Sequence, residues 1–143
     1  MYTNILVPID LDDKYSWQIC LKKALQIKVV YPDAKIHILT VIQTFVGIME
    51  DFFPQEWLEG VQVKVMEELQ KIVANEIPKN IDVSLHVASG VVYQAILDKA
   101  EEIKSDLIII SAHHPDRRDY LLGPSAARVV RHADVSVLVV RGK

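Results

Sequence analysis

Residues 108–125 have the sequence IIISAHHPDRRDYLLGPS, in which three kinds of local structure follow one another. The run begins with three apolar, β-branched residues, a pattern typical of a strand buried on both faces. A polar and charged segment follows, and then a helical pattern with Ser125 as its expected N-cap. Such a connection is either a plain link or a binding loop, and a long loop without regular structure is uncommon unless functional. A helix N-terminus that follows a buried strand favours an anion site.

The rest of the chain repeats this alternation of strand and helix. The spacing of apolar residues predicts strands at 5–7, 35–41, 81–87, 107–110 and 135–140, and helices at 14–30, 55–77, 92–103 and 125–132. The pattern predicts one α/β domain over residues 1–143, a doubly wound parallel sheet with helices on both faces. Gly60 leaves open whether the second helix begins at residue 55 or only after the glycine.

Residues 43–57 are rich in large apolar side chains and contain Gly47 and Pro54. Three interpretations remain open for this segment. It could bridge the second strand to the next helix, form the wall of a pocket, or offer a surface to a partner.

Composition excludes several classes of protein. The chain has 143 residues, a net charge of −3 and 50% hydrophobic residues, which is an ordinary globular balance. It has no basic stripe typical of a nucleic-acid binder and no run of ~20 apolar residues that would span a membrane. Residues 1–4 carry no basic side chain, unlike a signal peptide. Cys20 stands alone, so we expect a cytoplasmic protein without disulfides.

A phosphate cradle is the site that these residues favour most. Gly123 would let a ligand approach closely, Ser125 offers a hydroxyl, and the N–H groups of Ala126 and Ala127 are expected to face outward. Asp10, at the end of the first strand, could accept hydrogen bonds from a ribose or a base. It could equally cap the first helix or close a turn.

Catalytic and metal motifs are lacking. His113, His114 and Asp116 are close in sequence, but they match no common metal-ligand pattern. Ser111 and Ser125 are not in a G-x-S-x-G elbow, and no P-loop motif occurs. We therefore predict no catalytic residue and no metal ligand.

Several blocks of the sequence together resemble the universal stress protein family, most closely its short F-type branch with a His-x-Pro-Asp loop. The resemblance covers the whole chain. It rests on the segment 4–10 (NILVPID), His113, the segment 121–123 (LLG), the segment 129–133 (VVRHA) and the segment 135–141 (VSVLVVR). It implies a five-stranded parallel sheet of strand order 3-2-1-4-5, a homodimer, and in many members adenine nucleotide binding.

The nucleotide-binding members of that family carry the motif G-x2-G-x9-G-[ST] after the fourth strand. Transferred to this chain, the first two glycines fall on Ser111 and His114, and the third on Gly123. Eight residues rather than nine separate His114 from Gly123, and Pro124 occupies the Ser/Thr position. Ser125 could replace the lost hydroxyl.

The resemblance implies a site for ATP or AMP, with Mg²⁺ as a companion ion. The adenosine side would be formed by Pro8, Ile9, Asp10 and Val41. The phosphate side would be formed by Ser111, His113, His114, Gly123, Ser125 and Ala126.

The sequence is therefore compatible with two functions. The first is a stress-response protein that binds an adenine nucleotide and hydrolyses it slowly at most. The second is an interaction protein without nucleotide that acts through its dimer and residues 43–57. In both, the apolar last strand Val135–Val140 is expected to pair with the same strand of a second copy, because an exposed apolar edge is otherwise a liability.

Overall fold

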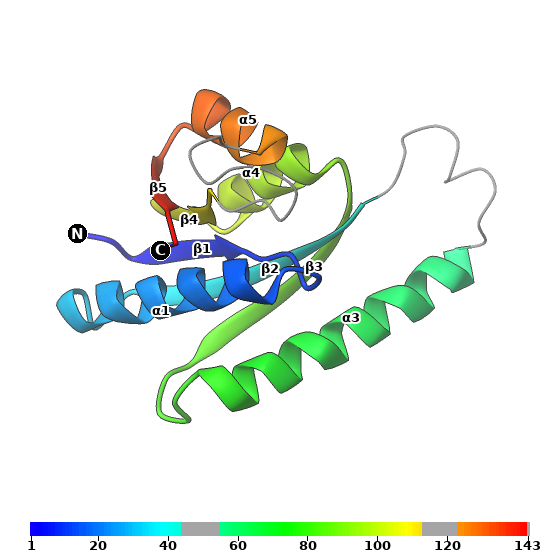
Figure 1. The fold of residues 1–143 in the computed structure, drawn as a ribbon, viewed down its shortest axis with the longest axis horizontal. Helices are drawn as coiled ribbons and strands as arrows, with labels where there is room; N and C mark the ends of the chain where they lie inside the picture. Colours follow the sequence, from blue (N-terminus) through cyan, green and yellow to red (C-terminus); the bar gives the residue numbers. More distant parts are fainter. Residues whose placement is uncertain (44–54, 113–122, 143) are drawn as a thin grey trace.

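The computed structural model describes residues 1–43, 55–112 and 123–142. Strands and helices alternate along the chain (Figure 1). The elements are β1 (Asn4–Pro8), α1 (Lys14–Val30), β2 (Lys35–Gln43), α3 (Gln55–Glu76), β3 (Val83–Gly90), α4 (Val92–Glu102), β4 (Leu107–Ser111), α5 (Pro124–His132) and β5 (Ser136–Val140). The five strands form one parallel sheet in the order β3-β2-β1-β4-β5, which confirms the expected α/β fold and strand order.

The sheet separates two apolar cores because successive side chains of a strand point to opposite faces. Ile5 and Val7 of β1 pack with α1 and α3 on one face. Leu6 packs with Ile96 of α4 and Val129 of α5 on the other. Figure 1 shows these two helix layers on either side of the sheet. In β4, Ile108 and Ile109 are completely buried, as predicted for a strand covered on both faces.

Several predicted boundaries need correction. β2 continues to Gln43 rather than 41, β3 runs from Val83 to Gly90 rather than from 81 to 87, and β5 begins at Ser136 rather than Val135. The N–H of Ile81 donates to the carbonyl of Pro78 at 3.0 Å, so this residue belongs to a turn. α3 begins at Gln55, and Gly60 lies inside the helix.

A further correction concerns the start of α5. Its N-cap is Gly123, not Ser125, and Pro124 is the first helical residue. Proline favours this position because its fixed φ suits a helix and its missing N–H would have no partner there. The helix therefore starts at the proline, and Ser125 lies in the first turn.

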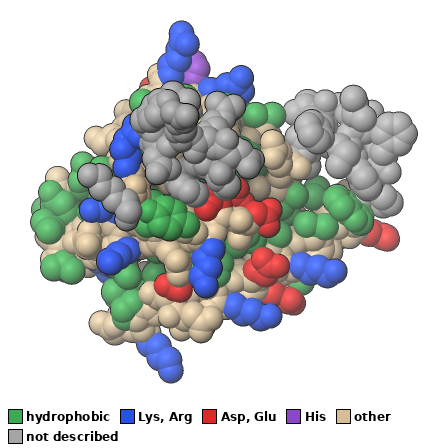
Figure 2. Space-filling view, in the orientation of Figure 1, with side chains coloured by type: hydrophobic (Ala, Val, Ile, Leu, Met, Phe, Trp, Pro, Cys, Tyr) green, Lys and Arg blue, Asp and Glu red, His purple; other side chains and the backbone are tan. Residues whose placement is uncertain are grey.

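The remaining segments, residues 44–54 and 113–122, lie outside the described residues, and most of the apolar segment 43–57 falls among them. Among the described helices, none is both long and apolar enough to cross a membrane. On the face in Figure 2, the described Lys and Arg side chains are scattered among acidic and apolar ones rather than gathered in a stripe.

Candidate functional site

The candidate site lies where the direction of winding of the sheet reverses. β1 pairs with β2 on one side and with β4 on the other. The chain therefore winds in one direction from β1 to β2 and in the opposite direction to reach β4. In doubly wound sheets, ligands bind beyond the carboxyl ends of the strands at this switch point. Pro8 ends β1 and Ser111 ends β4. The two predicted sides of the site therefore lie at the same end of the sheet, where the carboxyl ends of these strands meet.

The segment after β1 is fastened to the neighbouring strand. The N–H of Ile9 donates to the carbonyl of Leu39 at 2.8 Å, and Ile9 is buried. Asp10 is exposed, and its Oδ1 accepts the N–H of Asp12 at 2.9 Å in a tight turn. Asp13, not Asp10, caps α1 by accepting the N–H of Ser16 at 3.1 Å. Asp10 thus closes the turn and still presents its carboxylate at the surface.

A hydrogen bond between two serine hydroxyls joins α1 to the end of β4. The Oγ of Ser16 donates to the Oγ of Ser111 at 2.8 Å, and Ser16 is only 6% exposed. Ser111 stands at the first glycine position of the nucleotide-binding motif that the resemblance implies. Ser16 is the contact that sequence reasoning missed. Its position could have indicated the contact, because Ser16 is a polar residue in the first turn of α1, the helix that begins at the switch point.

α5 begins with backbone donors that the helix itself does not satisfy. Its N-cap Gly123 has φ −64° and ψ 160°, and no side chain of the described residues caps the helix. The N–H of Ala127 donates to the carbonyl of Gly123 at 3.0 Å, so it does not face outward as expected. The N–H groups of Ser125 and Ala126 have no acceptor within the helix, because the first turn offers none. They are the donors that the helix start can direct to an anion.

The backbone of Gly123 has an ordinary conformation. Its φ lies in the region that every residue adopts, so the position does not need the conformational freedom of glycine. What glycine provides here is the absence of a side chain beside the helix start.

The structure places the predicted residues unevenly. Pro8, Ile9, Asp10, Val41 and Ser111 lie at the carboxyl ends of adjacent strands, and the last three predicted positions lie at the start of α5: Gly123, Ser125 and Ala126. His113 and His114 lie outside the described residues. A surface cavity of about 280 Å³ is lined by Ser89 at the end of β3 and by residues of the first half of α4, and none of the predicted site residues that the structure describes lines it.

The comparisons with known proteins agree with this geometry. The model of the universal stress protein family matches residues 1–141. The chain belongs to the universal stress protein family. The resemblance of the sequence to that family is thereby confirmed.

Individual universal stress proteins are similar along their whole length. Universal stress protein G of Escherichia coli O157:H7 is 28% identical over 144 residues, which cover 99% of this chain and all of that protein. The structure of the universal stress protein UspA from Lactobacillus plantarum is 26% identical, with a TM-score of 0.72 and coverage of 98% of both chains.

Two further structures of similar fold contain nucleotides. One is a universal stress protein in complex with cAMP, 22% identical with a TM-score of 0.63, and the alignment covers 99% of this chain and 98% of that one. The other is the universal stress protein from Archaeoglobus fulgidus in complex with dAMP, 15% identical with a TM-score of 0.71 and coverage of 98% of both. At these identities the likeness shows the fold alone.

Proposed function

We propose that this universal stress protein binds an adenine nucleotide, ATP or AMP with Mg²⁺, beyond the carboxyl ends of β1 and β4. The observation that carries the proposal is the start of α5 at the switch point, where two backbone N–H groups have no helical acceptor and the N-cap Gly123 has no side chain to supply one. Relatives of the same fold bind cAMP and dAMP, which supports an adenine nucleotide as the ligand. Binding would serve a stress response in the cytoplasm.

The adenosine end of the ligand would meet the β1–β2 side of the edge. Half-buried Val41 offers apolar surface to the base, and the exposed carboxylate of Asp10 accepts hydrogen bonds from ribose or base. The buried side chain of Ile9 supports this surface from the core. Pro8 ends the strand beneath them.

The phosphates would meet the β4–α5 side. The N–H groups of Ser125 and Ala126 donate, and the positive end of the helix dipole adds a favourable field. Gly123 keeps the approach open because it has no side chain. Ser111, His113 and His114 complete the phosphate side, and we assign no catalytic residue.

The alternative function is that of an interaction protein without nucleotide, and one contact favours it. Ser111 places a side chain at a position where nucleotide-binding relatives have glycine, and its hydroxyl is already engaged by Ser16 at 2.8 Å. In this case the protein would act through its dimer and the apolar residues 43–57.

Thermal unfolding with ATP, with AMP and without ligand separates the two functions. A ligand that binds only the folded protein must raise the melting temperature as its concentration rises. The nucleotide function predicts a concentration-dependent rise with at least one of the two nucleotides. No rise with either at millimolar concentration would favour the alternative.

Calorimetry on Gly123→Val then tests the position of the phosphates. Valine can adopt the backbone angles observed at Gly123, so the variant adds only bulk beside the helix start. We expect nucleotide affinity to fall at least tenfold. Gly60→Ala is the matched control, because a Cβ there has no neighbour within 4 Å. If Gly123→Val binds as tightly as the parent, the phosphates lie elsewhere.

We further propose that residues 1–143 form one domain and that two copies associate through residues 135–140. β5 is the last strand at one edge of the sheet and, within the part of the chain that the structure describes, pairs only with β4, which leaves its outer side for a second copy. Antiparallel pairing about a two-fold axis would join the two sheets.

A further inference from the structure

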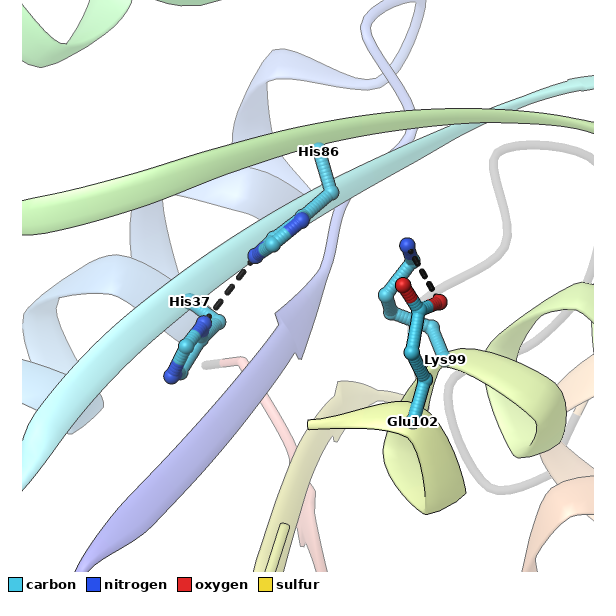
Figure 3. A network of polar contacts seen from close by, with 4 residues as sticks. All are labelled: His37, His86, Lys99 and Glu102. Atoms are coloured by element: carbon cyan, nitrogen blue, oxygen red, sulfur yellow. Dashed lines mark hydrogen bonds and ion pairs between the residues drawn. The ribbon is translucent and has the colours of Figure 1, made fainter. Parts of the chain in front are cut away.

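Two histidines on neighbouring strands share a hydrogen bond on the face of the sheet that carries α4 (Figure 3). His37 lies on β2 and His86 on β3, and Nδ1 of His37 is 3.0 Å from Nε2 of His86. The two rings lie nearly parallel, with an angle of 23° between them. His37 is only 7% exposed, and His86 is half-buried.

The second nitrogen of His37 shows how the protons are arranged. Nε2 of His37 is 3.1 Å from Oδ1 of Asn4, an amide oxygen that only accepts. His37 therefore carries its proton on Nε2, and its bare Nδ1 accepts the N–H of His86. Both rings are neutral in this arrangement, and one N–H lies between them.

The surroundings oppose an additional proton. The pKa of His37 is lowered to about 4, mainly by burial and further by the neighbouring His86, Lys35 and Lys99. Burial also lowers the pKa of His86, as do Lys99 and Lys35, whereas Glu102 raises it. Glu102 is held by Lys99 in an ion pair of 2.7 Å on α4, so its charge is largely compensated.

We propose that the His37–His86 pair is an acid-sensitive latch that holds the edge strand β3 against β2 and α4. β3 is the last strand on its side of the sheet and pairs only with β2 among the described residues, from Val83 opposite Ile36 to Gly90 opposite Gln43. An edge strand is the part of a sheet that can open with the least disruption elsewhere. When His37 takes up a proton on Nδ1, both facing nitrogens carry hydrogen, so the hydrogen bond between the rings is lost and the strand moves to let water reach them.

The direction of the pH dependence follows from the lowered pKa values. The latch is fully closed above the ordinary histidine pKa of about 6.5 and weakens as the pH falls toward 4. For His37 alone, linkage predicts that opening between pH 7 and pH 5 becomes about 20-fold more favourable, given its pKa of about 4.

Amide hydrogen exchange of the wild-type protein at pH 7 and pH 5 tests the latch directly. After correction for intrinsic exchange rates, we expect protection of the β3 amides bonded to β2 to fall about 20-fold, the factor that linkage gives. The β3 amides should also be less protected than those of Ile108 and Ile109 in β4 at both pH values, because β3 opens without the rest of the sheet. Equal protection of the two strands, which would mean that β3 opens only when the whole protein unfolds, or no fall in β3, overturns the proposal.

Variants separate the pair from other titrating groups. His37→Gln/His86→Gln keeps polar side chains but has no imidazole, so the loss of β3 protection at pH 5 should disappear. His132→Gln removes an exposed histidine at the end of α5, and this control variant should still lose β3 protection at pH 5. If the double variant does not fold, NMR titration of the wild-type rings decides instead. Titration of both rings near pH 6.5 contradicts the latch.

Discussion

Pro124 has two opposite effects at the start of α5. Its fixed φ suits the first helical position and stabilises the helix, but it removes one of the backbone donors that a phosphate could use. Because nucleotide-binding members of the family have Ser or Thr here, this residue is the sharpest departure of the chain from their pattern. Its neighbour Ser125 lies in the first turn and does not cap the helix.

Pro124→Ser is therefore expected to strengthen nucleotide binding. It restores an N–H and a hydroxyl at the helix start, and a hydrogen bond to a charged phosphate contributes ~1.5–3 kcal/mol, or about tenfold or more in affinity. Calorimetry with ATP measures the change. Affinity equal to or weaker than that of the parent would mean that Ser125 already supplies the hydroxyl, or that the phosphates do not meet this turn.

At the scale of elements, α3 packs along only part of its length. Leu69 is its buried residue, and Ile72 and Val73 pack against the core, whereas Trp57 near its start is 45% exposed. In Figure 1 the first half of α3 extends away from the sheet. Helix propensity therefore matters most in this half, where tertiary contacts with the sheet contribute least.

Gly60 lies in that half of α3, and Gly60→Ala should stabilise the protein by about 0.5–1 kcal/mol. Alanine loses less backbone entropy than glycine on entering a helix, and its Cβ has no atom within 4 Å to displace. Urea denaturation measures the difference. Gly90→Ala is the opposite case, because Gly90 has φ +124°, and it should destabilise the protein. An unchanged or lower midpoint for Gly60→Ala would show that the first half of α3 is not a stable helix.

For the molecule as a whole, the two edges of the sheet differ. β3 carries the polar pair member His86, whereas β5 consists of Val137, Leu138, Val139 and Val140 after Ser136. Val137 and Val139 are only partly buried against the α4–α5 core. An apolar edge of this kind is normally covered or paired in natural proteins.

Light scattering should therefore detect a dimer of the wild-type protein. Val137→Lys/Val139→Lys places charge beside the strand edge through which the two copies would pair. This double variant should be a monomer or should aggregate. Ser89→Lys on the opposite edge strand is the control and should remain dimeric. A wild-type protein that is monomeric at ~100 micromolar, well above the dissociation constant of a stable dimer, would contradict this assembly.

The sequence by itself determined the kind and order of the elements. Alternating strand and helix patterns gave the α/β class, and α1 occupies the predicted residues 14–30. The apolar run at 107–110 was recognisable as a buried strand. These features were predictable because side-chain periodicity is a local property, set by whether a segment faces a core on one side or on both.

Tertiary structure decided which segments meet. The pairing of β1 with β4 follows from no local pattern, and strand order was expected only through the family resemblance. Ser16 meets Ser111 across 95 positions of the chain, and His37 meets His86 across 49. Such contacts depend on strand order and register, which arise from packing the whole sheet at once. The start of α5, in contrast, has a local explanation, because the proline ring suits the first helical position better than a cap at Ser125.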